Sequence, residues 1–263
     1  MIQDYTHPGR IPLSEHEYQV LLKEQSTEGK ALVSAVQTVM SAFPVQPENN
    51  EQSAVLHTLQ ERCYAILRET ARTDELLWYL TEAQPAEDVY SLCKPLRRLV
   101  NQFAEMSEDR FTVDADGVGA QLFAAVNPER LTFVLLIALT EMMLTAKDSG
   151  TVSFCAEVKD HRVVIRSEQC GESAELLTAR PAADEMILTR FCNLYNAAFS
   201  RYSAPGMRGF TLDFPDASRP DTETVRSDRF IPQTGKFSVY RVMLSEVLPV
   251  ADSPDDAEED ILL

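Results

Sequence analysis

Two segments of the chain repeat their apolar residues at alternating intervals of four and three, and a short turn signal joins them. In residues 14–43 the repeating positions are Tyr18, Leu22, Gln25, Gly29, Leu32, Val36, Val39 and Phe43. In the second segment they are Leu56, Leu59, Cys63, Ile66, Thr70, Thr73, Leu77 and Leu80. This spacing is typical of helices that pack along a common seam. Because FPVQPENN lies between the segments, the sequence predicts an antiparallel helical hairpin.

Further apolar residues widen the stripe on each helix beyond that seam: Leu21, Val33, Met40, Val55, Leu67 and Leu76. A hairpin alone would leave these side chains half-covered, so another surface must pack against them. We expect that surface to be a second copy of the hairpin, which gives a homodimer with a four-helix bundle. The alternative is that the stripe packs against the chain's own second domain.

After Gln84-Pro85 the chain changes to mixed helix and strand patterns. We predict strands at 110–116, 120–126, 151–158, 162–168, 209–215 and 237–249, and helices at 85–108, 128–146 and 183–199. This order predicts an α+β domain in which helices cover one face of a mixed sheet. The predicted organisation is an N-terminal arm (1–13), a helical hairpin (14–84), the α+β domain (85–250) and a disordered acidic tail (251–263).

The charge of the chain limits the partners it can have. The 24 Lys and Arg residues against 41 Asp and Glu residues give a formal net charge of −17, whereas a nucleic-acid surface needs clustered basic residues. We therefore expect no nucleic-acid partner. No apolar stretch approaches the roughly 20 residues of a membrane-spanning helix, and no hydrophobic signal segment is visible. The five cysteines are widely spaced without a zinc-binding pattern, so we expect a cytoplasmic protein without a metal site.

The order of these elements resembles the core of sensor histidine kinases, in which a dimerisation hairpin precedes an ATPase-like α/β sandwich. The resemblance is also local. NPERLTFVLLIAL, from Asn127, and GTVSFCAEVKDHRVVIRS, from Gly150, are similar to the family's ATP-binding helix and the long β-hairpin after it. Asp88-Val89 lies where the family begins its catalytic domain. The likeness covers about residues 14–250 and implies a homodimeric protein of the two-component signalling type.

The magnesium-binding positions of that family are substituted in this chain. The family's ATP-binding helix carries two asparagines four residues apart, the second of which holds Mg²⁺, and the matching positions here are Ile137 and Glu141. Isoleucine neither donates nor accepts a hydrogen bond. Glutamate binds hard cations through oxygen, but its charge repels a triphosphate. Glu141 is therefore better interpreted as an ionic partner for a nearby arginine or lysine.

The adenine-binding turn of the family is degraded as well. In the family an Asp-x-Gly-x-Gly turn follows the β-hairpin, and its aspartate reads the adenine amino group. The matching residues here are Gln169, Gly171 and Ser173. The adenine-reading carboxylate is therefore lost unless Glu168 has moved into its place.

The family's glycine-rich phosphate loop has no counterpart either. The chain offers LLTARPAADEMILTRF, which contains no glycine and starts its helix with Asp184 and Glu185. Backbone amides at a helix N-terminus attract anions, but two carboxylates already fill that role. Because all three nucleotide motifs are degraded together, we expect neither ATP nor Mg²⁺ as a cofactor.

Two histidines lie on the predicted hairpin, each two residues before a seam position. In the family an exposed imidazole beside the seam accepts a phosphoryl group, since imidazole is nucleophilic near neutral pH. His16 lies on the first helix and keeps the family's His-Glu pair with Glu17, but it is close to the helix start and lacks the family's following Arg and Pro. His57 lies on the second helix, which is the wrong one by order. The plain alternative for both is a solvated surface histidine.

These observations leave three functional hypotheses. The first is a histidine phosphotransferase in which His16, or His57 in second place, relays a phosphoryl group, similar to bacterial phosphotransferases with a decayed ATP domain. The second is a pseudokinase, a docking module for a response-regulator receiver domain or a partner kinase. The third is a divergent but active ATP-dependent histidine kinase that uses Glu141 as a metal ligand.

Overall fold

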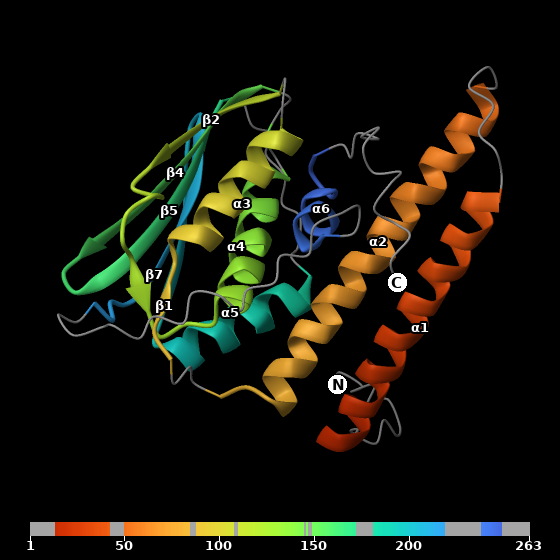
Figure 1. The fold of residues 1–263 in the computed structure, drawn as a ribbon, viewed down its shortest axis with the longest axis horizontal. Helices are drawn as coiled ribbons and strands as arrows, with labels where there is room; N and C mark the ends of the chain where they lie inside the picture. The colour runs from red at the N-terminus through yellow and green to blue at the C-terminus, as the bar shows by residue number, and fades with distance from the viewer. Residues whose placement is uncertain are drawn as a thin grey trace, which may run out of the picture.

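The computed structural model describes residues 14–42, 50–84, 88–107, 110–144, 146, 149–171, 181–218 and 238–248. The predicted N-terminal arm and acidic tail lie outside this part of the chain. Two long helices form a hairpin on one side of the molecule, with α2 next to the α+β domain and α1 on the outside (Figure 1). None of the described helices combines the length and the apolar character that a membrane span requires.

The hairpin consists of α1 (Glu15–Ala42) and α2 (Asn50–Thr81), as predicted. A capping box starts α1: a carboxylate oxygen of Glu17 accepts a hydrogen bond from the backbone N–H of Ser14 at 2.8 Å, and Ser14 Oγ accepts one from the N–H of Glu17 at 3.3 Å. The two helices approach closely at Gly29, where a Cβ atom would lie 2.5 Å from Thr70 Oγ1. Glycine therefore permits this contact.

The packed side of α1 differs from the predicted seam. The buried positions are Leu22, Ser26 and Val33, and Ser26 donates a hydrogen bond to Asp74 on α2. Several apolar residues of α1 are instead more than a third exposed: Tyr18, Val20, Leu21, Leu32 and Val39. The structure therefore leaves an apolar stripe along the outer helix, which we call the α1 stripe.

The α+β domain contains a mixed sheet. Its elements are β1 (Tyr90–Ser91), α3 (Cys93–Met106), β2 (Phe111–Asp116), β3 (Phe123–Ala124), α4 (Pro128–Met143), β4 (Gly150–Lys159), β5 (Arg162–Cys170), α5 (Ala182–Tyr195), β6 (Ala198–Ala204), β7 (Met207–Pro215) and α6 (Val239–Leu244). The five-stranded sheet has the order β2-β4-β5-β7-β6, in which β2 and β4 are parallel and the other neighbours are antiparallel. Strands β1 and β3 form a separate antiparallel pair. The predicted α+β class is confirmed.

Helix α4 is the centre of the core. Asn127 caps its start by accepting a hydrogen bond from the backbone N–H of Glu129 at 2.9 Å, and Pro128 occupies the first helical position. Every residue from Leu131 to Thr140 is buried. The helix is apolar on all sides because it lies between the sheet and other helices. Figure 1 shows α3 and α4 side by side on one face of the sheet.

The long β-hairpin is confirmed, and so is the helix predicted over 85–108, which starts later than expected. The turn between β4 and β5 is at Asp160 and His161, whose φ angles of 50° and 61° suit a two-residue type I′ turn. The helix predicted from residue 85 begins at Cys93, because the preceding residues pair with β3 as strand β1. Apolar spacing alone did not reveal this short pairing.

In the C-terminal half one predicted helix is confirmed but ends earlier, and one strand prediction is wrong. The helix predicted over 183–199 ends at Tyr195, since Asn196 adopts the left-handed conformation that ends helices, and strand β6 follows. The strand predicted at 237–249 contains helix α6, whose first turn is capped by Ser238. Four of the six residues of α6 are buried, and such an apolar run has no period that distinguishes helix from strand.

Helix α2 packs against α5 and α6 of the domain. Leu76 and Tyr79 are 3% and 6% exposed and belong to the domain core, and Trp78 meets Tyr79 edge to face with ring centroids 5.0 Å apart. The alternative that the widened apolar stripe covers the chain's own domain therefore holds for Leu76 in the C-terminal part of α2, whereas Val55 near the start of α2 is 59% exposed. On α1, where the stripe is exposed, the homodimer stays a prediction.

Candidate functional site

A cavity of about 310 Å³ lies between the domain and the hairpin. Its walls come from α4, the start of α5, strands β6 and β7, Arg72 of α2 and Glu246 just after α6. The two positions that correspond to the magnesium-binding asparagines, Ile137 and Glu141, both line it. The cavity is therefore located where the sequence resemblance places a nucleotide.

Glu141 is held by an arginine from the edge of the sheet. Arg201 of β6 places its Nε 3.1 Å from both carboxylate oxygens of Glu141. A second nitrogen of the same guanidinium, Nη2, lies 3.2 Å from Glu185 in the first turn of α5. The expected ionic partner of Glu141 is thus Arg201. Ile137 is 2% exposed and serves as part of the apolar core.

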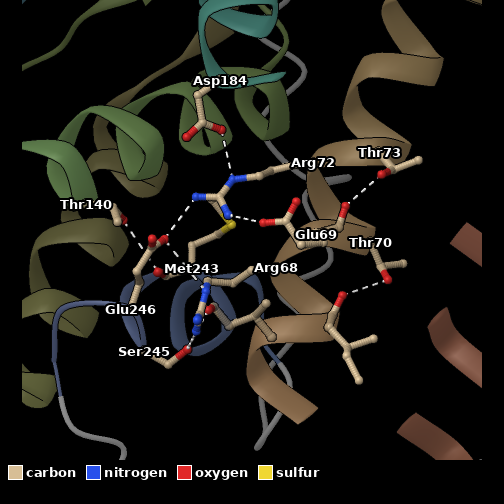
Figure 2. Close-up of polar contacts among 12 residues, drawn as sticks. Arg68, Glu69, Thr70, Arg72, Thr73, Thr140, Asp184, Met243, Ser245 and Glu246 are labelled. Carbon is tan, nitrogen blue, oxygen red and sulfur yellow. Dashed lines mark hydrogen bonds and ion pairs between the residues drawn. The ribbon is translucent and has the colours of Figure 1, made fainter. Parts of the chain in front are cut away.

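Arg72 connects the hairpin to α5 and to the residues after α6 (Figure 2). Its Nε donates to Asp184 of α5 at 2.9 Å, its Nη2 to Glu246 at 2.9 Å and its Nη1 to Glu69 on its own helix at 2.8 Å. The Arg72 side chain is 4% exposed. Burial raises the pKa of Asp184, and the neighbouring Arg72 guanidinium only partly opposes that shift. The start of α5, where the family cradles phosphates, is therefore occupied by an ion pair with the hairpin.

The charges that line the cavity are balanced. The basic residues in its walls are Arg72, Arg201 and Arg208, and the acidic ones are Glu141, Asp184 and Glu246. A triphosphate entering this space would meet three carboxylates beside three arginines. Arg72 pairs with Asp184 and Arg201 pairs with Glu141, so the charge of these two arginines is already compensated by the protein.

The adenine-reading position is occupied by a buried amide. Gln169 is fully buried on β5, and among the described residues neither its Nε2 nor its Oε1 has a hydrogen-bond partner. Glu168 faces the opposite side of the sheet, because side chains alternate along a strand. There it accepts a hydrogen bond from Tyr202 Oη at 2.6 Å. The Tyr202 ring reaches it by crossing Gly209, where a Cβ atom would lie 2.5 Å from the ring. Glu168 has therefore not taken the aspartate's place.

Parts of the degraded motifs fall outside the described residues. Ser173 and most of the segment that replaces the phosphate loop belong to residues 172–180. Gly171, the one conserved glycine of the adenine turn, is described and has a φ of 146°. In the part of the chain that the structure covers, no group of three or more His, Cys, Asp or Glu side chains is arranged to hold a metal ion.

The two candidate histidines lie at opposite ends of the hairpin. His16 is exposed in the first turn of α1, which lies beside the end of α2. His57 is exposed near the start of α2, with its Nε2 3.4 Å from Glu61 one turn later. His57 and Glu61 border a groove of about 220 Å³ that continues along α2 to Arg68 and the residues after α6. The structure therefore does not bring His16 and His57 together.

Sequence reasoning missed Arg72 and Arg201. Arg68, Arg72 and Glu75 are spaced by four and three along α2, so they share one face. Charged residues at this spacing are typical of a solvated helix face, and the pattern therefore gave no sign of burial. Arg201 was missed because β6 was not predicted as a strand.

Comparisons with known proteins agree on the fold. The sequence matches no protein-family model, and no curated protein matches it either. Among solved structures, the Acinetobacter baumannii histidine kinase AdeS aligns with 72% of this chain and 96% of its own, with a TM-score of 0.51 and 9% identity. Full-length ShkA in complex with AMPPNP aligns with 78% of this chain and 45% of its own, with a TM-score of 0.50 and 16% identity. The chain thus has a histidine kinase-like fold.

Proposed function

We propose that this chain is a cytoplasmic signalling protein of the two-component type whose histidine kinase-like core works without ATP. The observation that carries this proposal is the pair of ion-pair clusters in the cavity, Glu141 with Arg201 and Arg72 with Asp184. Each cluster uses a position that a nucleotide's phosphates or metal ion would need. In this reading the domain is a scaffold, and its partners act on the hairpin.

The α1 stripe supports a hairpin that works as a docking surface. Leu32 and Val39 are 52% and 53% exposed on α1, and Val55 on α2 is 59% exposed. Contiguous exposed apolar residues mark interaction surfaces. We propose that a second copy of the hairpin covers this stripe in a homodimer, and that a receiver domain or a partner kinase docks on the resulting bundle.

Within this architecture, the exposure of His16 favours a phosphotransferase over a pure docking module. An imidazole nitrogen of His16 would attack the phosphorus of a receiver's aspartyl phosphate. A P–N bond forms, the P–O bond of the acyl phosphate breaks, and the aspartate carboxylate leaves. The position in the first turn of α1 leaves this side chain open to solvent.

Phosphoryl transfer tests this assignment. The full chain is incubated with a phosphorylated receiver domain or a small acyl-phosphate donor, and acid-labile label on the chain is measured. We expect label on the parent protein and on the His57→Gln variant, and none on His16→Gln. Label that persists in His16→Gln contradicts the assignment. No label on any of the three proteins identifies the chain as a docking module without phosphotransfer.

A further inference from the structure

The face of α2 that meets the domain carries an unusual row of polar side chains. Arg68, Arg72, Glu75 and Tyr79 follow one another at intervals of four, three and four. Arg68 donates to Ser245 at 2.6 Å, Arg72 bridges Asp184 and Glu246, and Glu75 pairs with Arg130 in the first turn of α4. The row therefore fastens α2 to three separate places of the domain, and we call it the α2 joint.

Of the two buried acids at the α2 joint, Glu75 and Asp184, Glu75 is the less exposed. Its side chain is 3% exposed, and one oxygen pairs with the Arg130 guanidinium. Arg130 in turn lies over the ring of Trp78, 4.2 Å from its centroid. Among the described residues, the other oxygen of Glu75, Oε1, has no hydrogen-bond partner, and neither has Tyr79 Oη one turn later. A buried carboxylate oxygen without a donor is costly while it is charged.

The surroundings of Glu75 favour its neutral form. Desolvation by burial raises the pKa of Glu75 to about 7, more than the charge of Arg130 lowers it. Glu129 on α4 and Asp74 on α2 raise it further, and the Tyr79 and Tyr195 phenols complete its surroundings from α2 and α5. A proton on Glu75 removes a buried negative charge and supplies a hydrogen-bond donor.

At the contact between Arg72 and Asp184, carboxylates outnumber guanidinium groups. Asp184 is buried at 8% side-chain exposure and shares the Arg72 guanidinium with Glu246 and Glu69. Arg68 lies near the same carboxylate of Glu246, 3.7 Å away. Three carboxylates thus face two guanidinium groups, and burial with this excess raises the pKa of Asp184.

We propose that the α2 joint is a protonation-sensitive connection: proton uptake by Glu75 and Asp184 holds the hairpin on the domain, and proton release allows α2 to separate from it. In the separated state both carboxyls face water and titrate at their ordinary values. Protons therefore bind preferentially to the docked state, so docking is tightest at low pH and weakens as pH rises. The joint works whether or not the hairpin carries a phosphoryl group.

The expected change of the docking equilibrium with pH can be calculated from Glu75 alone. A carboxyl that titrates at 4.5 when exposed and at about 7 when docked lowers the docking equilibrium constant roughly 70-fold between pH 5 and pH 8. Asp184 acts in the same direction. Most of the change from Glu75 falls between pH 5 and pH 7.

The chain contains its own reporter of this equilibrium. Trp78 is the single tryptophan of the sequence, and it lies in the joint against Arg130 and Tyr79. Quenching of its fluorescence by acrylamide, a neutral quencher, measures its exposure to solvent. We expect quenching of the full chain to increase from pH 5 to pH 8, with a parallel increase of the radius of gyration in small-angle scattering.

Matched variants separate the joint from other titrations. The Glu75→Gln/Asp184→Asn variant mimics both protonated side chains, so we expect its quenching to stay at the low-pH level throughout, and Glu75→Gln alone to show a reduced pH dependence. His57→Gln and His16→Gln on the same hairpin serve as controls, and both should keep the parent's pH dependence. Quenching and scattering that do not change with pH in the parent overturn the proposal. So does a pH dependence that survives in Glu75→Gln/Asp184→Asn, is undiminished in Glu75→Gln, or disappears in either histidine variant.

Discussion

Replacement of Arg72 by methionine tests how the buried ion cluster of Figure 2 contributes to stability. The Arg72 side chain is 4% exposed; methionine keeps much of its apolar stem but removes the guanidinium that pairs with Asp184 and Glu246. Breaking a buried pair in this way costs about 3–5 kcal/mol, because the remaining charge is left without a partner. Asp184 escapes this cost by taking up a proton, so the cost of its protonation is the upper limit of the penalty.

The upper limit of the stability loss in Arg72→Met depends on pH and can be calculated. Protonating an aspartate of ordinary pKa costs about 4 kcal/mol at pH 7 and about 1.5 kcal/mol at pH 5. We therefore expect Arg72→Met to lower the free energy of unfolding by up to about 4 kcal/mol at pH 7, and by about 2.5 kcal/mol less at pH 5. Because the pKa of Asp184 is raised in the native state, the contribution of this ion pair is lost as pH falls through that raised value, above the ordinary aspartate pKa.

Urea unfolding at fixed protein concentration, followed by Trp78 fluorescence, measures both values. Each variant is compared with the parent at the same pH, so that titration of other groups cancels. The double variant Arg72→Met/Asp184→Asn should recover all but about 1 kcal/mol of the loss at pH 7, since it leaves no unpaired charge at Asp184. A penalty that is equal at both pH values, or no recovery in the double variant, refutes the reasoning.

Three further changes have expected outcomes. Asn127→Ala removes the cap of α4 and should cost about 1 kcal/mol in urea unfolding, whereas Asn127→Asp, which keeps the acceptor oxygen, should be nearly neutral. Gly209→Ala should cost about 1–3 kcal/mol, because its Cβ would lie 2.5 Å from the Tyr202 ring; an unchanged melting temperature contradicts this. Leu32→Asp places a charge in the α1 stripe and should convert a dimer to a monomer in light scattering while the helical circular dichroism persists.

The sequence predicted the elements with a clear period better than the others. The two hairpin helices have a period of four and three over about 30 residues each, and β4 and β5 alternate around a two-residue turn. These elements were predicted correctly. Helix α6 and strand β1 are short, and short segments contain too few residues to define a period.

The sequence indicated part of the cavity through its substituted motifs. The resemblance aligned Ile137 and Glu141 with the family's magnesium-binding positions, and both residues line the cavity. Arg201 and Arg72, which fill that position with charge, come from a different strand and from the hairpin. Contacts between residues about 60 and 110 positions apart are set by tertiary packing, which local spacing does not encode.

Binding of Mg-ATP measured by titration calorimetry tests the central claim most directly. The cavity is charge-balanced by Arg201 with Glu141 and by Arg72 with Asp184, so we predict no binding heat for Mg-ATP in the micromolar range, for the parent and for Glu141→Ala alike. Micromolar binding by the parent that disappears in Glu141→Ala would contradict the account. It would identify Glu141 as a metal ligand and the chain as a divergent but active kinase.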